Sequence, residues 1–173
     1  MDDAAVLAAQ IDRPLRSSAD VVVRCHLDLP VVMRVPPLLD DGTPFPTTYW
    51  LSCPLAVRRI SRVESAGGVR AMERRALADT AFGAALEEAH ARYQSERDAL
   101  VPDGSEPRPS GGVAGARTGV KCLHAHYADH AAGNKNPVGE VTAPWVEPLD
   151  CAMPCVVEGA GGVELNRRWT EPR

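Results

Sequence analysis

Cysteine and histidine gather in one short segment of the chain. Cys122, His124, His126 and His130 bring one thiol and three imidazoles close together in sequence. On a helix, Cys122, His126 and His130 lie four residues apart and share one face, a spacing by which helices present metal ligands. On a strand, Cys122, His124 and His126 share a face instead. Gly133 is typical of a helix end and favours the helix. The segment predicts metal binding or thiol catalysis, with a core cysteine and solvent-facing histidines as the alternative.

Two further thiols are predicted at the ends of regular elements. Cys53 precedes Pro54, which suits the first turn of a helix, so Cys53 is expected near a helix N-terminus, where the peptide dipoles lower the pKa of a thiol. The alternative for Cys53 is a small buried hydrophobic residue. Cys25 ends a β-branched run and is expected at a strand end. Because this strand and the strand leading to Cys53 are able to pair, both thiols are predicted to open onto one edge of a sheet.

The last two cysteines carry less information. Cys151 and Cys155 are separated by a number of residues that zinc sites tolerate, but they lack the two-residue spacing of a zinc knuckle. Taken alone, such a pair is more often incidental. The sequence therefore leaves open whether Cys151, Cys155 and His130 belong to a site.

These residues support a first hypothesis, a transition-metal site in which zinc is the favoured ion. Three thiolates and one imidazole would make a closed structural site, whereas an open position would permit water activation. An iron–sulfur cluster that uses Cys155 is a less favoured variant, because clustered ferredoxin spacing is missing. The predicted metal ligands are Cys25, Cys53 and Cys122, with His124 or His126.

Two other hypotheses remain. A metal-free, cysteine-dependent enzyme would use Cys53 or Cys122 as nucleophile and His124 or His126 as base. A non-catalytic interaction protein would present Trp50 and the neighbouring proline-rich loop to a partner. Basic residues also permit a small anionic ligand, with a solvated helix face as the alternative. These residues are Arg58, Arg59, Arg62 and Lys121.

The elements that must position these side chains indicate an α+β fold. β-branched runs and turn residues predict a small sheet over about residues 21–52. Helical periodicity predicts covering helices over about 54–100 and 120–132. One domain is expected over residues 1–173, with a flexible proline- and glycine-rich connection at 101–118 and an irregular C-terminal tail.

The composition narrows the class of protein. A formal net charge of −4 gives no support for nucleic-acid binding, and 45% apolar residues suffice for a core. No apolar run approaches the roughly 18 to 20 residues of a membrane span. Asp2 and Asp3 are acidic at the position where a secretory signal peptide carries basic residues. We therefore expect a cytoplasmic protein with reduced cysteines and no membrane partner. Walker A, dinucleotide-binding, nucleophile-elbow, H-E-x-x-H and C-x-x-C signatures are all missing from the sequence.

Several segments together resemble the domain of unknown function 501 family. The resemblance rests on Arg24-Cys25 with Pro30, on the runs 41–54 and 119–128, and on 136–139, so it extends from about residue 20 to 145. It implies a bacterial, largely actinobacterial protein of a family without an established activity. It also implies that Cys25, Cys53, Cys122, His124 and His126 occupy characteristic segments. The chain departs from the family pattern at Asp28, where the resemblance leads us to expect glycine.

Overall fold

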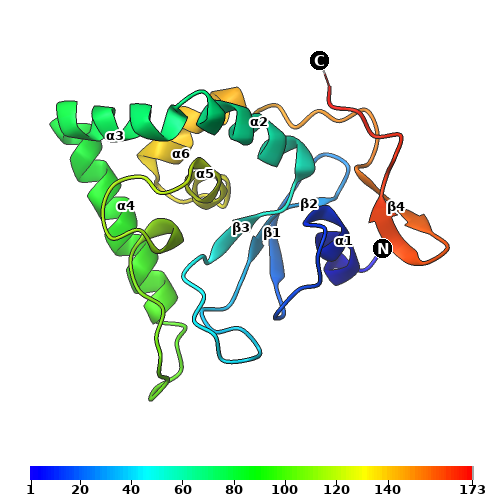
Figure 1. Cartoon of the computed structure of the whole chain (residues 1–173), viewed down its shortest axis with the longest axis horizontal. Coiled ribbons are helices and arrows are strands. Elements are labelled where there is room, and N and C mark those ends of the chain that lie inside the picture. Colours follow the sequence, from blue (N-terminus) through cyan, green and yellow to red (C-terminus); the bar gives the residue numbers. More distant parts are fainter. Residues whose placement is uncertain (173) are drawn as a thin grey trace.

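The structure is a computed structural model that describes residues 1–172, and its elements are arranged as Figure 1 shows. The helices and strands follow one another in this order: α1 (Asp3–Gln10), β1 (Asp20–Arg24), β2 (Pro30–Arg34), β3 (Tyr49–Leu51), α2 (Pro54–Ser65), α3 (Gly68–Ala78), α4 (Thr80–Asp98), the short 3-10 helix η1 (Val113–Gly115), α5 (Leu123–Ala131), α6 (Pro137–Thr142), the 3-10 helix η2 (Ala143–Trp145), β4 (Val156–Gly159) and β5 (Gly162–Leu165). The predicted α+β class, with its small sheet and its covering helices, is confirmed.

The main sheet is antiparallel, with the strand order β1-β2-β3. The central strand β2 is buried on both faces. Met33 packs with Leu7 of α1, whereas Val32 packs into the cluster that Leu55 of α2 and Leu123 of α5 help to form. Burial on both faces explains why this strand is a continuous apolar run rather than an alternating one.

Local signals explain the long helical arm formed by α2, α3 and α4 (Figure 1). The Asp79 carboxylate caps α4 by accepting hydrogen bonds from the backbone N–H groups of Ala81 and Phe82, each at 3.1 Å. The apolar side chains of α4 recur at helical spacing and are buried, with Tyr93 only 1% exposed. The helix α2 begins at Pro54 and places Cys53 at its N-cap, as the sequence predicts.

The helix that carries the histidines begins later than predicted. Cys122 is the N-cap of α5 and has an extended backbone, with φ −162° and ψ 126°. An N-cap residue leaves the helical path, so its side chain does not continue the face of the following turns. The prediction that Cys122 shares a helix face with His126 and His130 is therefore wrong.

Two regions outside the sheet differ in their packing. In the segment 101–118, residues around Val113 and Ala114 are buried, whereas most of residues 102–108 are exposed. The flexibility of the connection stays a prediction, and we now expect it within 102–108.

The C-terminal tail is only partly irregular, because β4 and β5 pair as a hairpin that packs beside α1 (Figure 1). Along residues 1–172, no helix is both long and apolar enough to cross a membrane.

Candidate metal centre

A thiol, an imidazole and a carboxylate converge at the N-terminal end of α5. The Cys122 sulfur, a His124 ring nitrogen and a Glu64 carboxylate oxygen lie within 4.8 Å of one another. Nδ1 of His124 is 3.6 Å from the Cys122 sulfur and 3.2 Å from the nearer Glu64 oxygen. Within residues 1–172, no other group of three potential ligands comes this close.

Each of the three side chains is held by its own element. Glu64 lies in the last turn of α2, and its Oε1 accepts a 2.6 Å hydrogen bond from the backbone N–H of Leu123, at the first position of α5. A carboxylate at a helix N-terminus is stabilised by the helix dipole. The extended N-cap turns the Cys122 thiol back toward His124 in the first turn. The packing of α2 against α5 therefore assembles the group.

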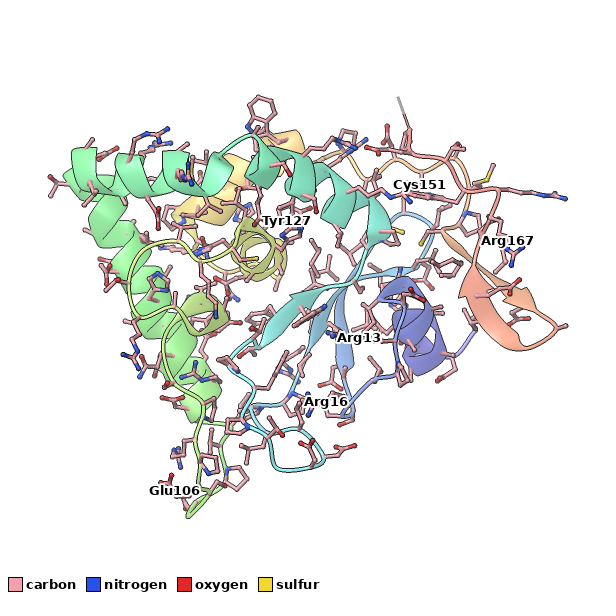
Figure 2. All side chains as sticks on the ribbon, viewed as in Figure 1. Arg13, Arg16, Glu106, Tyr127, Cys151 and Arg167 are labelled. Atoms are coloured by element: carbon pink, nitrogen blue, oxygen red, sulfur yellow. The ribbon has the colours of Figure 1, made fainter. Side chains whose placement is uncertain are left out.

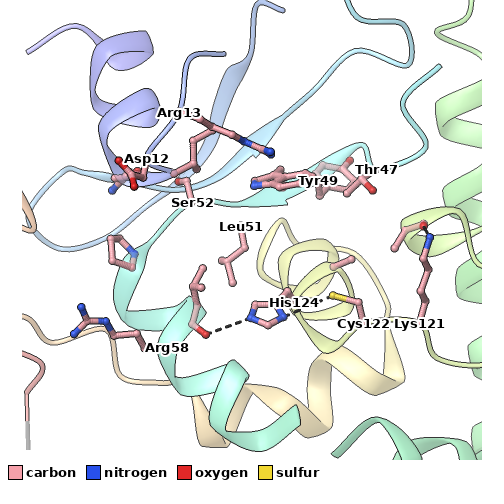
Figure 3. Close-up of a pocket in the computed structure, with 17 residues that line it drawn as sticks. Asp12, Arg13, Thr47, Tyr49, Leu51, Ser52, Arg58, Lys121, Cys122 and His124 are labelled. Carbon is pink, nitrogen blue, oxygen red and sulfur yellow. Dashed lines mark hydrogen bonds between the residues drawn. The ribbon is translucent and has the colours of Figure 1, made fainter. Parts of the chain in front are cut away.

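The opposite side of the imidazole indicates which nitrogen carries a proton. Nε2 of His124 lies 3.2 Å from the Val57 carbonyl oxygen, a contact that Figure 3 shows as a dashed line. It also lies 3.3 Å from Ser61 Oγ. A backbone carbonyl can only accept, so Nε2 is the protonated nitrogen. In the neutral ring, the lone pair of Nδ1 then points at the thiol and the carboxylate. The Cys122 sulfur, the Glu64 oxygen and the Nδ1 lone pair would repel one another. A cation or a proton between them removes this repulsion.

The electrostatics of His124 reflect this crowding. Burial alone would lower the pKa of its imidazole, but the hydrogen bond and charge of Cys122, the charge of Glu64 and the Val57 carbonyl together raise the pKa above its ordinary value. Anionic neighbours therefore outweigh desolvation at this position. The surroundings of His124 favour positive charge.

A cleft of about 690 Å³ opens beside Cys122 and His124. Its walls combine apolar side chains, among them Tyr49, Trp50 and Val57, with three cationic residues and one carboxylate, Asp12. Figure 3 shows Arg13 and Tyr49 across the cleft from His124, with Arg58 and Lys121 on either side of it. The mixture of an apolar wall and a few convergent polar groups is typical of small-molecule sites.

The three cations of the cleft are Arg13, Arg58 and Lys121. Arg13 lies over the Trp50 ring at 5.1 Å and Arg58 over the Trp169 ring at 4.8 Å, whereas Lys121 Nζ donates to the Ala114 carbonyl at 3.1 Å. Within the described chain, no ion pair joins any of these cations to a carboxylate. The cleft thus presents positive charge that the protein does not neutralise by direct contact.

The other two arginines of the predicted anion site are committed elsewhere. Arg59 donates to the carbonyl oxygens of Val146 and Pro148, at 2.6 Å each, and also pairs with Glu171. Arg62 is bonded to the same Glu171. The prediction is corrected for these two residues, because the C-terminal segment returns across α2 and supplies their partners.

His126 does not reach the centre. It is 0% exposed, and its Nδ1 is bonded to Asn136 Oδ1 at 3.0 Å, while its ring packs edge-on against His90. Burial lowers the pKa of His126 to about 4, so the ring is neutral. His126 therefore belongs to a buried polar network that ties α5 to α6. Helical geometry separates it from His124, which faces α2.

Cys25 and Cys53 lie together, but in a second place. They line a small cavity of about 10 Å³ that Cys151 and Cys155 also line. All four are free thiols, and burial raises the pKa of Cys53 to about 11 although the nearby amides of Leu55 and Ala56 oppose the shift. The single predicted set of ligands is thus divided between two locations.

Sequence reasoning missed Glu64, which has no local signal because its contact partner Leu123 is 59 residues away.

Comparison with known proteins gives one match. A family model described as a protein of unknown function (DUF501) matches residues 21–144, in agreement with the resemblance seen in the sequence. The matched stretch includes the residues of the candidate centre and ends before Cys151 and Cys155. No curated protein and no solved structure matches the chain.

Proposed function

Since the chain belongs to the DUF501 family of unknown function, we propose from the geometry of its site that it is a metal-dependent enzyme acting on a small anionic molecule. One observation carries the proposal. Cys122, His124 and Glu64 direct a sulfur, a nitrogen and an oxygen toward one point, and the Val57 carbonyl keeps the proton on the far nitrogen of the imidazole. A carbonyl partner of this kind commonly orients a metal-binding histidine.

The donor set suits a transition metal, and zinc in particular. Zinc accepts thiolate, imidazole and carboxylate ligands together, and catalytic zinc sites have three protein ligands and one open position. Cys122 and His124 line the cleft, so an open position would face it. A metal bound there would supply an activated water or would polarise a bound oxygen atom.

The residues of the cleft define the kind of substrate. Arg13, Arg58 and Lys121 would bind an anionic group such as a phosphate or a carboxylate. Tyr49 and Trp50 offer an apolar wall for the remainder of the molecule. Three cations and one carboxylate, Asp12, line the cleft, and this excess of positive charge favours an anionic substrate over a neutral one.

The metal-free cysteine enzyme is a weaker candidate for the same residues. In a nucleophile–base–acid arrangement, the acid binds the imidazole nitrogen opposite to the one that takes the proton. Here Cys122 and Glu64 both approach Nδ1, and Nε2 is occupied by Val57 and Ser61. The geometry therefore favours a shared cation over a proton relay.

Elemental analysis of the purified protein tests the proposal. We expect the Glu64→Gln variant to lose about one equivalent of metal per chain relative to wild type, because a neutral amide is a poor ligand. The matched control is Glu87→Gln, which alters an exposed glutamate on α4 and should retain the wild-type metal content. Equal metal content in wild type and Glu64→Gln would refute the metal site. Rapid alkylation of Cys122 with loss of any activity would then point to the thiol enzyme.

A further inference from the structure

Four of the five cysteines gather at one place, away from the candidate centre. Cys25, Cys53, Cys151 and Cys155 line the same cavity of about 10 Å³, and we call them the four-thiol cluster. Its other walls are mainly aliphatic, with Leu27, Leu29 and Leu55 among them. Cys53 and Cys155 are buried, and Cys25 and Cys151 are half-buried. The four thiols come from three separate parts of the fold, so the cluster is not a consequence of one cysteine-rich segment.

Two thiols of the cluster come from the ends of sheet strands. Cys25 follows β1 and opens a tight turn in which its N–H donates to the Leu29 carbonyl and its carbonyl accepts from the Asp28 N–H, both at 2.9 Å. Asp28 has a φ of 59°, a conformation that glycine adopts more readily, which agrees with the glycine expected there. Cys53 follows β3, and its N–H approaches the Val31 carbonyl of β2. The sheet register therefore brings Cys25 and Cys53 to the same end.

The other two thiols are delivered by the C-terminal segment. The ring nitrogens of His26 lie 2.9 Å from the Leu149 carbonyl and 3.0 Å from the Cys151 carbonyl, so the residue next to Cys25 binds the backbone at Cys151. Arg59 of α2 binds the same segment through Val146 and Pro148. Figure 2 places Cys151 beside the N-terminal end of α2, between the sheet and β4. Polar contacts therefore hold the C-terminal segment against both the Cys25 turn and α2.

N–H groups point at the sulfurs of the cluster. Trp169 Nε1 donates to the Cys151 sulfur at 3.4 Å, and Gln10 Nε2 donates to the Cys155 sulfur at 3.6 Å. Cys53 lies at the N-terminus of α2, where the peptide dipoles favour negative charge. N–H donors and a positive dipole stabilise a thiolate more than a neutral thiol. Burial nevertheless raises the pKa of Cys53 and Cys155, so these donors offset only part of the desolvation of a thiolate, and a bound cation would have to supply the rest.

We propose that the four-thiol cluster binds one soft divalent cation, of which zinc is the type, as a closed structural site that joins the C-terminal segment to the sheet. Four sulfurs satisfy a tetrahedral ion completely and leave no open position. Thiolate ligands select soft metals, so magnesium and calcium are excluded. Binding would release the thiol protons and draw the sulfurs together by rotation about Cα–Cβ, since in the described chain no three of them lie within 4.8 Å. The proposal does not rest on the function proposed for the cleft.

Titration of metal-free protein with Co²⁺ separates the two sites. Thiolate-to-cobalt charge-transfer absorption grows with the number of thiolate ligands, so the four-thiol cluster should give an intense band and the candidate centre a weak one. We expect Cys155→Ser to abolish the intense band, and Glu64→Gln to leave it unchanged. Cys122→Ser is the matched control, because it removes a thiol outside the cluster. A wild-type spectrum without the intense band would overturn the proposal.

A second measurement uses the folded wild-type protein, so it holds even if Cys155→Ser does not fold. Saturating Zn²⁺ should slow alkylation of Cys25 and Cys151, the half-buried thiols, by about tenfold or more, as mass spectrometry of labelled peptides would show. Trp169→Phe keeps the aromatic ring but removes the N–H donor, and should weaken zinc binding at the cluster about tenfold. Alkylation rates that do not respond to Zn²⁺ would refute the site, whatever the result for Glu64→Gln.

Discussion

The candidate centre and the four-thiol cluster use similar side chains in opposite surroundings. The centre has one thiol, an imidazole and a carboxylate at the wall of a large cleft, in which cationic side chains outnumber acidic ones. The cluster has four thiols around a cavity of about 10 Å³ with aliphatic walls. An open, charged position suits chemistry on a bound molecule, whereas a closed and sulfur-only one suits cross-linking of the chain. Ligand type and solvent access, rather than the presence of cysteine, therefore distinguish the two regions.

The largest expected effect is the loss of stability when metal is removed from the cluster. A cation that binds only the folded chain adds its binding free energy to stability. We expect a strong chelator to lower stability by about 3 kcal/mol or more, which corresponds to a fall of roughly 10 °C in Tm for a chain of this size. Thermal unfolding followed by circular dichroism measures this change. The same shift should occur in Glu64→Gln, and an unchanged Tm in both proteins would remove the structural role of the cluster.

The second largest effect on stability is expected from Tyr93, whose hydroxyl supports the backbone beside the cleft. The Tyr93 hydroxyl accepts hydrogen bonds from the N–H groups of Thr48 at 2.6 Å and Tyr49 at 3.2 Å, and Tyr49 lines the cleft. Tyr93→Phe leaves both donors without this partner and should cost about 1–3 kcal/mol in urea unfolding at pH 7. Zinc protection of Cys25 and Cys151 should persist in the folded variant. If that protection were lost instead, the two regions would not be independent.

The same tyrosine gives a pH dependence with a definite sign. Burial raises the pKa of Tyr93 to about 12, although the hydrogen bonds from Tyr49 and Thr48 oppose the shift. The unfolded chain loses the phenol proton near pH 10, before the folded chain does, so this residue lowers stability as the pH rises from about 10 to 12. The expected loss of unfolding free energy is about 3 kcal/mol, at about 1.36 kcal/mol for each unit by which the pKa is raised. The difference in unfolding free energy between wild type and Tyr93→Phe should therefore shrink above pH 10, and a constant difference would contradict the assignment.

A smaller effect is expected from the link between the Cys25 turn and the C-terminal segment. His26→Ala removes the contacts to the carbonyl oxygens of Leu149 and Cys151. Because His26 is exposed, the cost should be about 1 kcal/mol, and it should be larger with metal bound than without. Tm values of wild type and variant, each with Zn²⁺ and with chelator, measure it. An effect that is equal with and without metal would show that His26 does not support the cluster.

The smallest effect is expected from a single cation of the cleft. Lys121→Met should weaken binding of inorganic phosphate several-fold and leave the Tm within about 1 °C, because the side chain is exposed. Isothermal titration calorimetry of phosphate into wild type and variant measures the change. Arg70→Met, which alters an exposed arginine of α3 outside the cleft, is the control. Equal losses in both variants would indicate nonspecific charge and not a cleft site.

Local signals in the sequence determined the elements of this protein. The β-branched runs specified β1 and β2, because such side chains fit a pleated and buried surface. Pro54 and Asp79 marked the starts of α2 and α4, since a missing N–H and a capping carboxylate act within one turn. The same signals placed Cys53 at a helix N-terminus. These features depend on neighbours a few residues away, so one sequence was enough to predict them.

Only the tertiary structure decided which functional groups meet. Glu64 joins Cys122 and His124 because α2 packs against α5, across 59 residues of chain. His126, two residues from His124, is turned into the core by the helical rotation, and Cys151 and Cys155 reach Cys25 because the C-terminal segment returns to the sheet. Such contacts follow from the packing of whole elements and leave no local pattern. For that physical reason, the sequence predicted one metal site where the folded chain assembles two groups of potential ligands.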